Sequence, residues 1–244
     1  MKSLQKWAVL VSILILPFFV YFVFVYSAEE NFFVPLEVVG PPTVVRTESG
    51  WDSLDYHIPE WQFTDQHHEQ LSAADFQEKI YLASFFFSRC PSICPSMNFR
   101  IQGLQERFKG FEDFRILSFT VDPDHDTVEV LQKYAERMNA QDGLWYFFTG
   151  ERDALYRTAG HYLLSAQEDS TADGGFLHSE QIVLIDWEGR IRSRKDDDGN
   201  VVGSYNALDE TQMRDLTDDI KVLIAEFEKE KAKREYRASK NKKD

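Results

Sequence analysis

The feature that most restricts the fold is an apolar strand that leads directly into a cysteine-containing turn and then into a helix. The run from Lys79 to Phe87 is almost continuously apolar and aromatic, which is typical of a strand buried on both faces of a sheet. The turn C-P-S-I-C-P follows at positions 90–95. Beyond it, apolar residues recur at helical spacing: Met97, Ile101, Leu104 and Phe108. Both cysteines are therefore expected where the strand passes into the helix.

The rest of the chain alternates between predicted strands and predicted helices. Core strands are expected at Phe114–Val121 and Leu144–Phe148, an edge strand at His57–Phe63, a helical turn at Leu71–Phe76, and helices at Thr127–Met138, Glu151–Ala159 and Asp209–Lys233. A hairpin is indicated by Gln181–Asp186 and Arg190–Arg194, on either side of Trp187-Glu188-Gly189. Strand–helix–strand units require parallel pairing, and the hairpin adds an antiparallel edge. This order, with cysteines at the end of the first core strand, predicts an α/β fold with a thioredoxin-like mixed sheet flanked by helices.

An N-terminal apolar segment predicts a membrane anchor. Lys2 and Lys6 precede an uncharged run from Trp7 to Tyr26, and Glu29 and Glu30 follow it. As a helix this run would span about 30 Å, the thickness of a bilayer core. Basic residues before the span and acidic residues after it place the N-terminus in the cytoplasm. We expect a single-pass transmembrane helix in the cell inner membrane, with the soluble domain on the periplasmic side.

A cleaved signal peptide is the alternative interpretation of this segment. The run is longer than the apolar core of a signal peptide, which is about 7–15 residues. A cut after Ala28 would also place Tyr26 where a small residue is required. We therefore favour an uncleaved anchor and expect four parts: an anchor at 1–28, a linker at 29–56 rich in Pro, Gly and Thr, a thioredoxin-like domain at 57–227, and a charged tail at 228–244.

Composition excludes two broad classes of protein. The formal net charge is −14, and an acidic chain repels the phosphate backbone, so nucleic acid is not an expected partner. The chain has only two cysteines, which excludes a scaffold held by several disulfides. Two cysteines this close in sequence either bond to each other or share one task.

The spacing of Cys90 and Cys94 puts both thiols on one face of a helical turn, because residues i and i+4 share a face. The start of a helix favours an anion and lowers the pKa of a thiol, and Pro95 is tolerated there. Two thiolates can hold a soft ion such as Cu(I) or can oxidise to a disulfide. The spacing alone leaves both outcomes open.

A third partner is expected from the loop before the strand at 181–186. His178 lies in that loop, which faces the cysteine turn in a thioredoxin-like sheet. Thiol–disulfide enzymes of this fold carry a cis-proline there, whereas this chain has no proline after Pro123. An imidazole at this place favours metal binding over general disulfide exchange.

Three sequence segments together resemble the Sco/SenC family over roughly His57 to Glu226. They are F-F-F-S-R-C-P-S-I-C-P-S-M, S-F-T-V-D-P-D-H-D-T-V-E-V-L and L-H-S-E-Q-I-V-L-I-D-W-E-G-R-I. The resemblance implies a membrane-tethered protein that delivers copper to the dinuclear copper site of cytochrome c oxidase, or reduces the cysteines of that site. It implies Cys90, Cys94 and His178 as the copper ligands. Many members have Asp before the histidine, where this chain has Leu177, so the partner that orients the imidazole stays open.

Other residues are weaker candidates. Asp122, at the end of the second core strand, is a candidate carboxylate behind the metal ligands. The simpler interpretation is a turn in which Asp126 or Thr127 caps the next helix. His67 and His68 are a weak candidate for an auxiliary metal pair.

The leading hypothesis is thus a copper metallochaperone whose partner is the copper-site subunit of cytochrome c oxidase or another copper protein. The enzymatic alternative is a thiol–disulfide oxidoreductase in which Cys90 and Cys94 are the redox-active pair. A third possibility is a redox sensor that signals through its long C-terminal helix.

Overall fold

The computed structural model describes residues 15–22, 34–47, 50–91, 93–168, 176–178 and 180–241. The chain divides into two compact units, Met1–Pro35 and Leu36–Asp244. In the first unit, residues 15–22 are helical and exposed. Most of the predicted span from Trp7 to Tyr26 lies outside the described residues. Within the described part, no helix combines the length and the apolar character needed to cross a membrane.

The second unit is built on a mixed sheet, as predicted, and this sheet has seven strands. Its order is β1 (Glu37–Val39), β12 (Ile191–Ser193), β11 (Gln181–Ile185), β6 (Ile80–Phe86), β7 (Phe114–Thr120) and β8 (Trp145–Phe148), with β13 (Tyr205–Asn206) also paired to β11. Strands β6, β7 and β8 are parallel, while β11 pairs antiparallel with β6 and β12. All seven residues of central strand β6 are buried, which explains why its sequence lacks a polar face.

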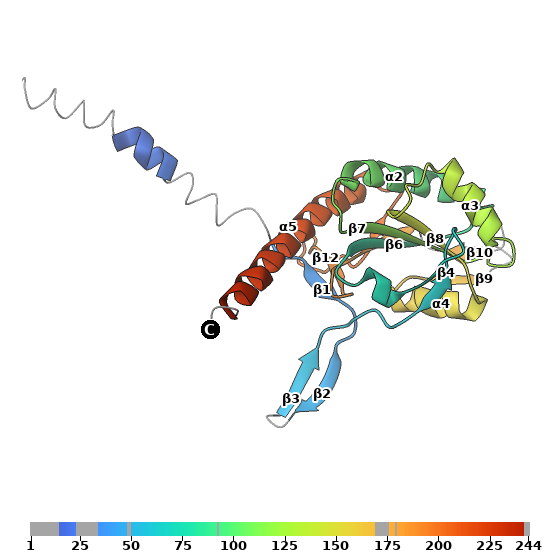
Figure 1. Cartoon of the computed structure of the whole chain (residues 1–244), viewed down its shortest axis with the longest axis horizontal. Coiled ribbons are helices and arrows are strands. Elements are labelled where there is room, and N and C mark those ends of the chain that lie inside the picture. Colours follow the sequence, from blue (N-terminus) through green and yellow to red (C-terminus); the bar gives the residue numbers. More distant parts are fainter. Residues whose placement is uncertain are drawn as a thin grey trace, which may run out of the picture. The chain divides into compact units, whose positions relative to one another are not determined.

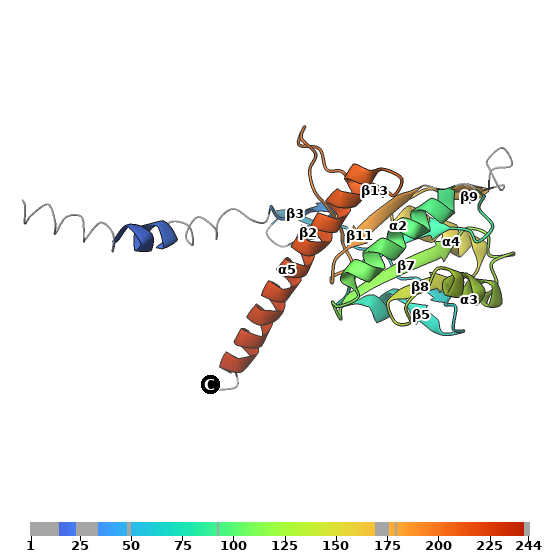
Figure 2. The same ribbon diagram turned by 90° about the horizontal axis from the view of Figure 1, so that it is seen from above.

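Helices cover both faces of this sheet. They are α2 (Ile93–Phe108), α3 (Val128–Arg137), α4 (Arg152–His161) and α5 (Glu210–Asn241). Figure 1 shows α2 on one side of the central strands and α4 on the other. Figure 2, seen from above, shows α5 running beside α2. The predicted helices are confirmed, and the fold is a thioredoxin-like α/β fold.

Aromatic side chains fill the core between sheet and helices. Phe119 of β7 stacks on Phe85 and Phe148, with ring centroids 5.2 Å apart in both pairs. Trp61 meets Phe119 edge-on, also at 5.2 Å. Each fully buried ring contributes about 1.5–3 kcal/mol through the apolar area it removes from water. This packing makes a rigid base for the turn that follows β6.

Several elements lie outside the predicted boundaries. Three strands fall within 29–56, the segment predicted as a linker: β1, which joins the main sheet, and the hairpin of β2 (Thr43–Thr47) and β3 (Gly50–Leu54). The predicted edge strand at His57–Phe63 is instead a separate pair, β4 (Gln62–Thr64) with β5 (Gln70–Ser72), followed by the short helix η1 (Ala73–Phe76).

The last helix is also longer than predicted. Helix α5 continues past Lys233 to Asn241 and crosses the predicted boundary at 227 without a break. Ion pairs explain part of this extension, because Lys231 binds Asp113 and Arg234 binds Glu78 at 2.9 Å.

Candidate metal centre

The two cysteines meet where β6 passes into α2. Cys90 lies in the connecting turn and Cys94 in the first turn of the helix. Both are thiols, with 8% and 1% of their surface exposed. The backbone N–H of Cys94 donates to Sγ of Cys90 at 3.4 Å. The sequence-based expectation that both sulfurs share one place is confirmed, and an N–H group at the helix start points at one of them.

Burial changes the acidity of this pair. The hydrogen bond with Cys90 and burial of the side chain together raise the pKa of Cys94 well above its ordinary value. Cys94 is therefore a protonated thiol at neutral pH when no metal is bound. This is opposite to the lowered thiol pKa expected at a helix start, because the neighbouring sulfur and burial outweigh the effect of the helix. A soft metal ion replaces such protons when it binds, because the thiolate is the ligand.

Asp126 anchors the turn that carries Cys90. Its carboxylate accepts hydrogen bonds from the backbone N–H of Ser88 at 3.0 Å, from the Ser88 hydroxyl, and from the Thr120 hydroxyl at 2.6 Å. Asp126 is fully buried. The expected helix cap is not formed, since Thr127 occupies the cap position of α3 without a capping side-chain bond and instead donates to Glu129. Asp126 was missed as a site residue because its partner in the cysteine turn, Ser88, is distant in sequence.

Asp122 fixes the residue next to Cys90. It is 2% exposed, and its Oδ2 accepts from Arg89 Nε at 2.6 Å. Its backbone carbonyl also accepts from the N–H groups of His125 and Asp126, which forms the predicted turn. The two carboxylates of this turn therefore hold two consecutive residues, Ser88 and Arg89, immediately before the first cysteine.

A second hairpin approaches the same turn. Strands β9 (Ala166–Glu168) and β10 (Phe176–His178) pair antiparallel, with His178 opposite Ala166. Phe176 packs on Phe87 with ring centroids 5.3 Å apart, and the Arg89 guanidinium lies 5.8 Å from the centre of the Phe176 ring. The structure thus places Phe176 of β10 against residues 87 and 89, just before Cys90. The side chain of His178 lies outside the described part.

The remaining histidines do not gather at a metal site. His67 Nε2 lies 3.2 Å from Asp142 Oδ1, and His125 is exposed in the turn before α3. Among the side chains that the structure describes, no three His, Cys, Asp or Glu groups are arranged to hold an ion. Tyr162 is fully buried and accepts a hydrogen bond from Trp61 Nε1 at 3.1 Å.

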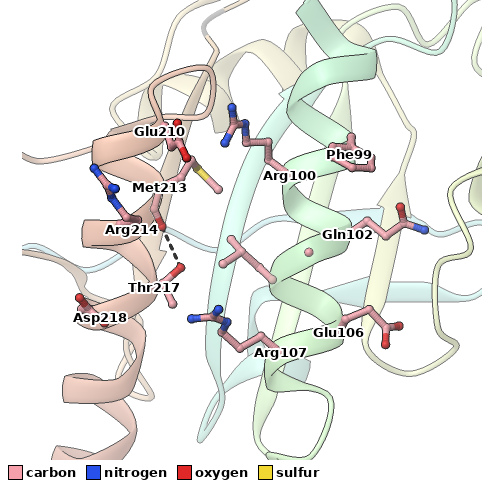
Figure 3. Close-up of a pocket in the computed structure, with 12 residues that line it drawn as sticks. Phe99, Arg100, Gln102, Glu106, Arg107, Glu210, Met213, Arg214, Thr217 and Asp218 are labelled. Atoms are coloured by element: carbon pink, nitrogen blue, oxygen red, sulfur yellow. Dashed lines mark hydrogen bonds between the residues drawn. The ribbon is translucent and has the colours of Figure 1, made fainter.

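A groove of about 640 Å³ lies away from the cysteines, between α2 and α5. Figure 3 shows Arg100 and Arg107 of α2 reaching toward α5. Carboxylates line the groove as well: Glu106, Glu210 and Asp218. This mixture of charges marks no particular ligand.

Comparison with known proteins shows which family the sequence matches. Residues 52–221 match the SCO1/SenC family. The chain is 27% identical over 172 residues to the SCO1 protein homolog of Bacillus subtilis (strain 168), covering 70% of this chain and 84% of that protein.

Solved structures show the same fold. The crystal structure of a SCO1/SenC family lipoprotein from Bacillus anthracis str. Ames superposes with a TM-score of 0.60 and 24% identity, covering 69% of this chain and 95% of that one. Bradyrhizobium japonicum ScoI with copper bound gives 0.51 and 23%, covering 65% and 96%. Because the family match extends over more than half of the sequence, the chain belongs to the SCO1/SenC family.

Proposed function

We propose that this protein is a copper metallochaperone that holds the ion with two thiolates, from Cys90 and Cys94, and one imidazole, from His178. The observation that carries the proposal is the contact of the two buried cysteines at the start of α2, where the Cys94 N–H donates to Cys90 Sγ at 3.4 Å. Paired thiolates in an apolar setting suit a soft ion such as Cu(I). The copper-bound ScoI structure, from the same family, supports copper as the cargo.

Packing of β10 supports His178 as the third ligand. Phe176 contacts Phe87, and the N–H of Cys90 donates to the carbonyl of Phe87 at 3.2 Å. Residue 178 is two positions along the same strand, and residues two apart share a face of a strand. A ligand on β10 would therefore approach the side of the turn that bears Cys90.

The anchor and the domain plan belong to the same proposal. The apolar run from Trp7 to Tyr26 would hold the protein in the inner membrane, with the cytoplasmic end at the N-terminus. The metal-binding domain would then stand on the periplasmic side. Of the predicted charged tail, 228–244, the residues up to Asn241 continue helix α5, and none of them belongs to the proposed ligand set.

Ligand exchange explains how such a site would pass copper on. Three protein ligands leave one side of the ion open to an acceptor thiolate. Cys90, with 8% of its surface exposed, is nearer to solvent than Cys94, with 1%, so transfer would begin by displacement of the Cys90 thiolate. BsSco, a solved relative, is described as a member of the Sco family of cytochrome c oxidase assembly proteins, which supports the copper site of that oxidase as the destination.

Anaerobic titration of the reduced full-length chain with Cu(I), against a competing chelator, tests this proposal. We expect one tightly bound copper per chain, and loss of tight binding in Cys90→Ala, Cys94→Ala and His178→Ala. His57→Ala is the matched control, because His57 is an exposed imidazole that is distant in sequence from Cys90, Cys94 and His178. Affinity that is unchanged in His178→Ala would exclude the three-ligand site.

A thiol–disulfide reductase is the second candidate, favoured by the closeness of the same two sulfurs. It requires both cysteines but no imidazole ligand. Reduction of a disulfide substrate at undiminished rate by His178→Ala, together with weak copper binding, would select it.

A further inference from the structure

A small hollow adjoins the cysteine turn on the side facing α3. Its volume is about 330 Å³. Ser88 and Arg89 of the turn line one side, His125 lies at the edge, and α3 contributes Lys133, Tyr134 and Arg137. Residues 133 and 137 are one helical turn apart, so their side chains extend along the same stripe of α3.

The charge of this hollow opposes that of the whole protein. The chain carries a formal charge of −14, yet Arg89, Lys133 and Arg137 all line the hollow. Among the described residues that line it, none has a carboxylate. Four other hollows of the described chain, one of which is the groove in Figure 3, are each lined by at least one Asp or Glu.

Nearby carboxylates already have hydrogen-bond partners, and two of them are buried. Asp126 is fully buried and accepts hydrogen bonds from Ser88 and Thr120, while Asp122 is 2% exposed and pairs with Arg89. Glu129 lies one turn before Lys133 in α3. Its carboxylate accepts a hydrogen bond from the Thr127 hydroxyl and also attracts Lys133 electrostatically. The groups that the hollow offers to solvent are therefore the donors of the exposed residues Lys133 and Arg137.

Arg137 is held in place for such a role. Its guanidinium stacks over the Tyr134 ring, 4.6 Å from the centroid, and Nη2 lies 3.5 Å from the carbonyl oxygen of Ser88. Stacking of this kind leaves the edge of the guanidinium available for a carboxylate.

We propose that this hollow is a docking site for the carboxylates of an acidic segment of a protein partner, the one that exchanges metal with Cys90 and Cys94. This inference rests on the proposed function. The cations lie one turn apart on α3, at Lys133 and Arg137, and in the neighbouring loop, at Arg89, which suits several carboxylates of an extended segment better than one small anion. A segment held there lies next to the cysteine turn, so docking brings the partner's own ligands to the metal. Opposite charges would also speed the encounter at low salt.

Fluorescence anisotropy with the full-length chain and a labelled oligo-aspartate peptide tests the site. We expect saturable binding that weakens as salt is raised, because the contacts are partly exposed. Lys133→Glu should weaken binding about fivefold or more at low salt, with Lys133→Gln intermediate. Lys240→Glu, with the same charge change near the end of α5, should leave binding unchanged. An oligo-lysine peptide should not bind.

Copper loading of the same samples separates this inference from the proposed function. Lys133→Glu should bind copper as the unaltered chain does, because Lys133 contacts neither cysteine in the proposed ligand set. Absence of saturable binding of the acidic peptide, or equal weakening in Lys133→Glu and Lys240→Glu, would overturn the docking site. Full competition by inorganic phosphate at equal charge concentration would also overturn it, in favour of a small-anion site. If the unaltered chain binds the acidic peptide but does not bind copper, the result contradicts the proposed function and leaves the docking site standing.

Discussion

Removing the carboxylate of Asp126 should loosen the cysteine turn and destabilise the domain. In Asp126→Ala, the Ser88 N–H and the hydroxyls of Ser88 and Thr120 all lose their acceptor. A buried donor without an acceptor costs about 1–3 kcal/mol. Thr120 is fully buried, whereas Ser88 is half-buried and can recover some bonding from water. We expect the free energy of unfolding to fall by about 3–5 kcal/mol.

A graded series makes this expectation specific. Asp126→Asn keeps one carbonyl oxygen and should cost about 1–2 kcal/mol, because charge-assisted hydrogen bonds become neutral ones. Asp124→Ala is the matched control in the same turn. Asp124 is exposed and pairs only at the surface with Arg152, so its loss should change the free energy of unfolding by about 0.5 kcal/mol or less.

Urea denaturation followed by tryptophan fluorescence measures these changes, and the reaction of the thiols with a disulfide reagent measures the turn itself. Asp126→Ala should expose Cys90 and Cys94 to the reagent under conditions where the domain is still folded. Equal stability of Asp126→Ala and Asp124→Ala, or unchanged thiol reactivity in Asp126→Ala, would refute the anchoring role of Asp126.

Three further predictions follow from the packing. Phe176→Ala should weaken copper binding about tenfold, because β10 loses its contact with the cysteine turn, while both thiols still react in a thiol titration. The control Phe99→Ala removes an exposed ring and should not change the copper affinity. Phe227→Ala should lower the free energy of unfolding by about 3–5 kcal/mol in a denaturant titration, since the ring is fully buried in α5. Burial raises the pKa of Asp113, but hydrogen bonds from lysines, led by Lys231, outweigh burial and hold the pKa below its ordinary value. The stability from Asp113 is thus present above about pH 4 and lost as the pH falls through the lower folded-state pKa, so Asp113→Asn should cost about 1–2 kcal/mol at pH 7 and little near pH 2.

Local patterns predicted the parts of the fold that repeat a simple period. The apolar run from Lys79 to Phe87 became the fully buried strand β6, and the helical spacing after it became α2. The meeting of Cys90 and Cys94 followed from the same two elements, because a strand that ends at a helix fixes the residues between them. Strand β1 could not be predicted this way, since its three residues are held by backbone pairing with β12 rather than by a side-chain pattern.

Long-range side-chain contacts account for what the sequence did not reveal at the site. The residues around Asp126 predict that it caps a helix. In the structure its carboxylate instead accepts a hydrogen bond from the backbone of Ser88, 38 residues earlier. Likewise, nothing near Lys133 in the sequence indicates that it lies beside the cysteine turn. The extension of α5 depends on Asp113 and Glu78, which contact the helix only after the chain has folded.

X-ray absorption of the copper-loaded full-length chain tests the ligand set of the proposed site most directly. We expect a copper environment of two sulfur atoms and one imidazole nitrogen in the unaltered chain and in His57→Ala. In His178→Ala the imidazole signal should disappear while both sulfurs remain. An environment with no imidazole, or one that keeps the same imidazole in His178→Ala, would rule out His178 as a copper ligand.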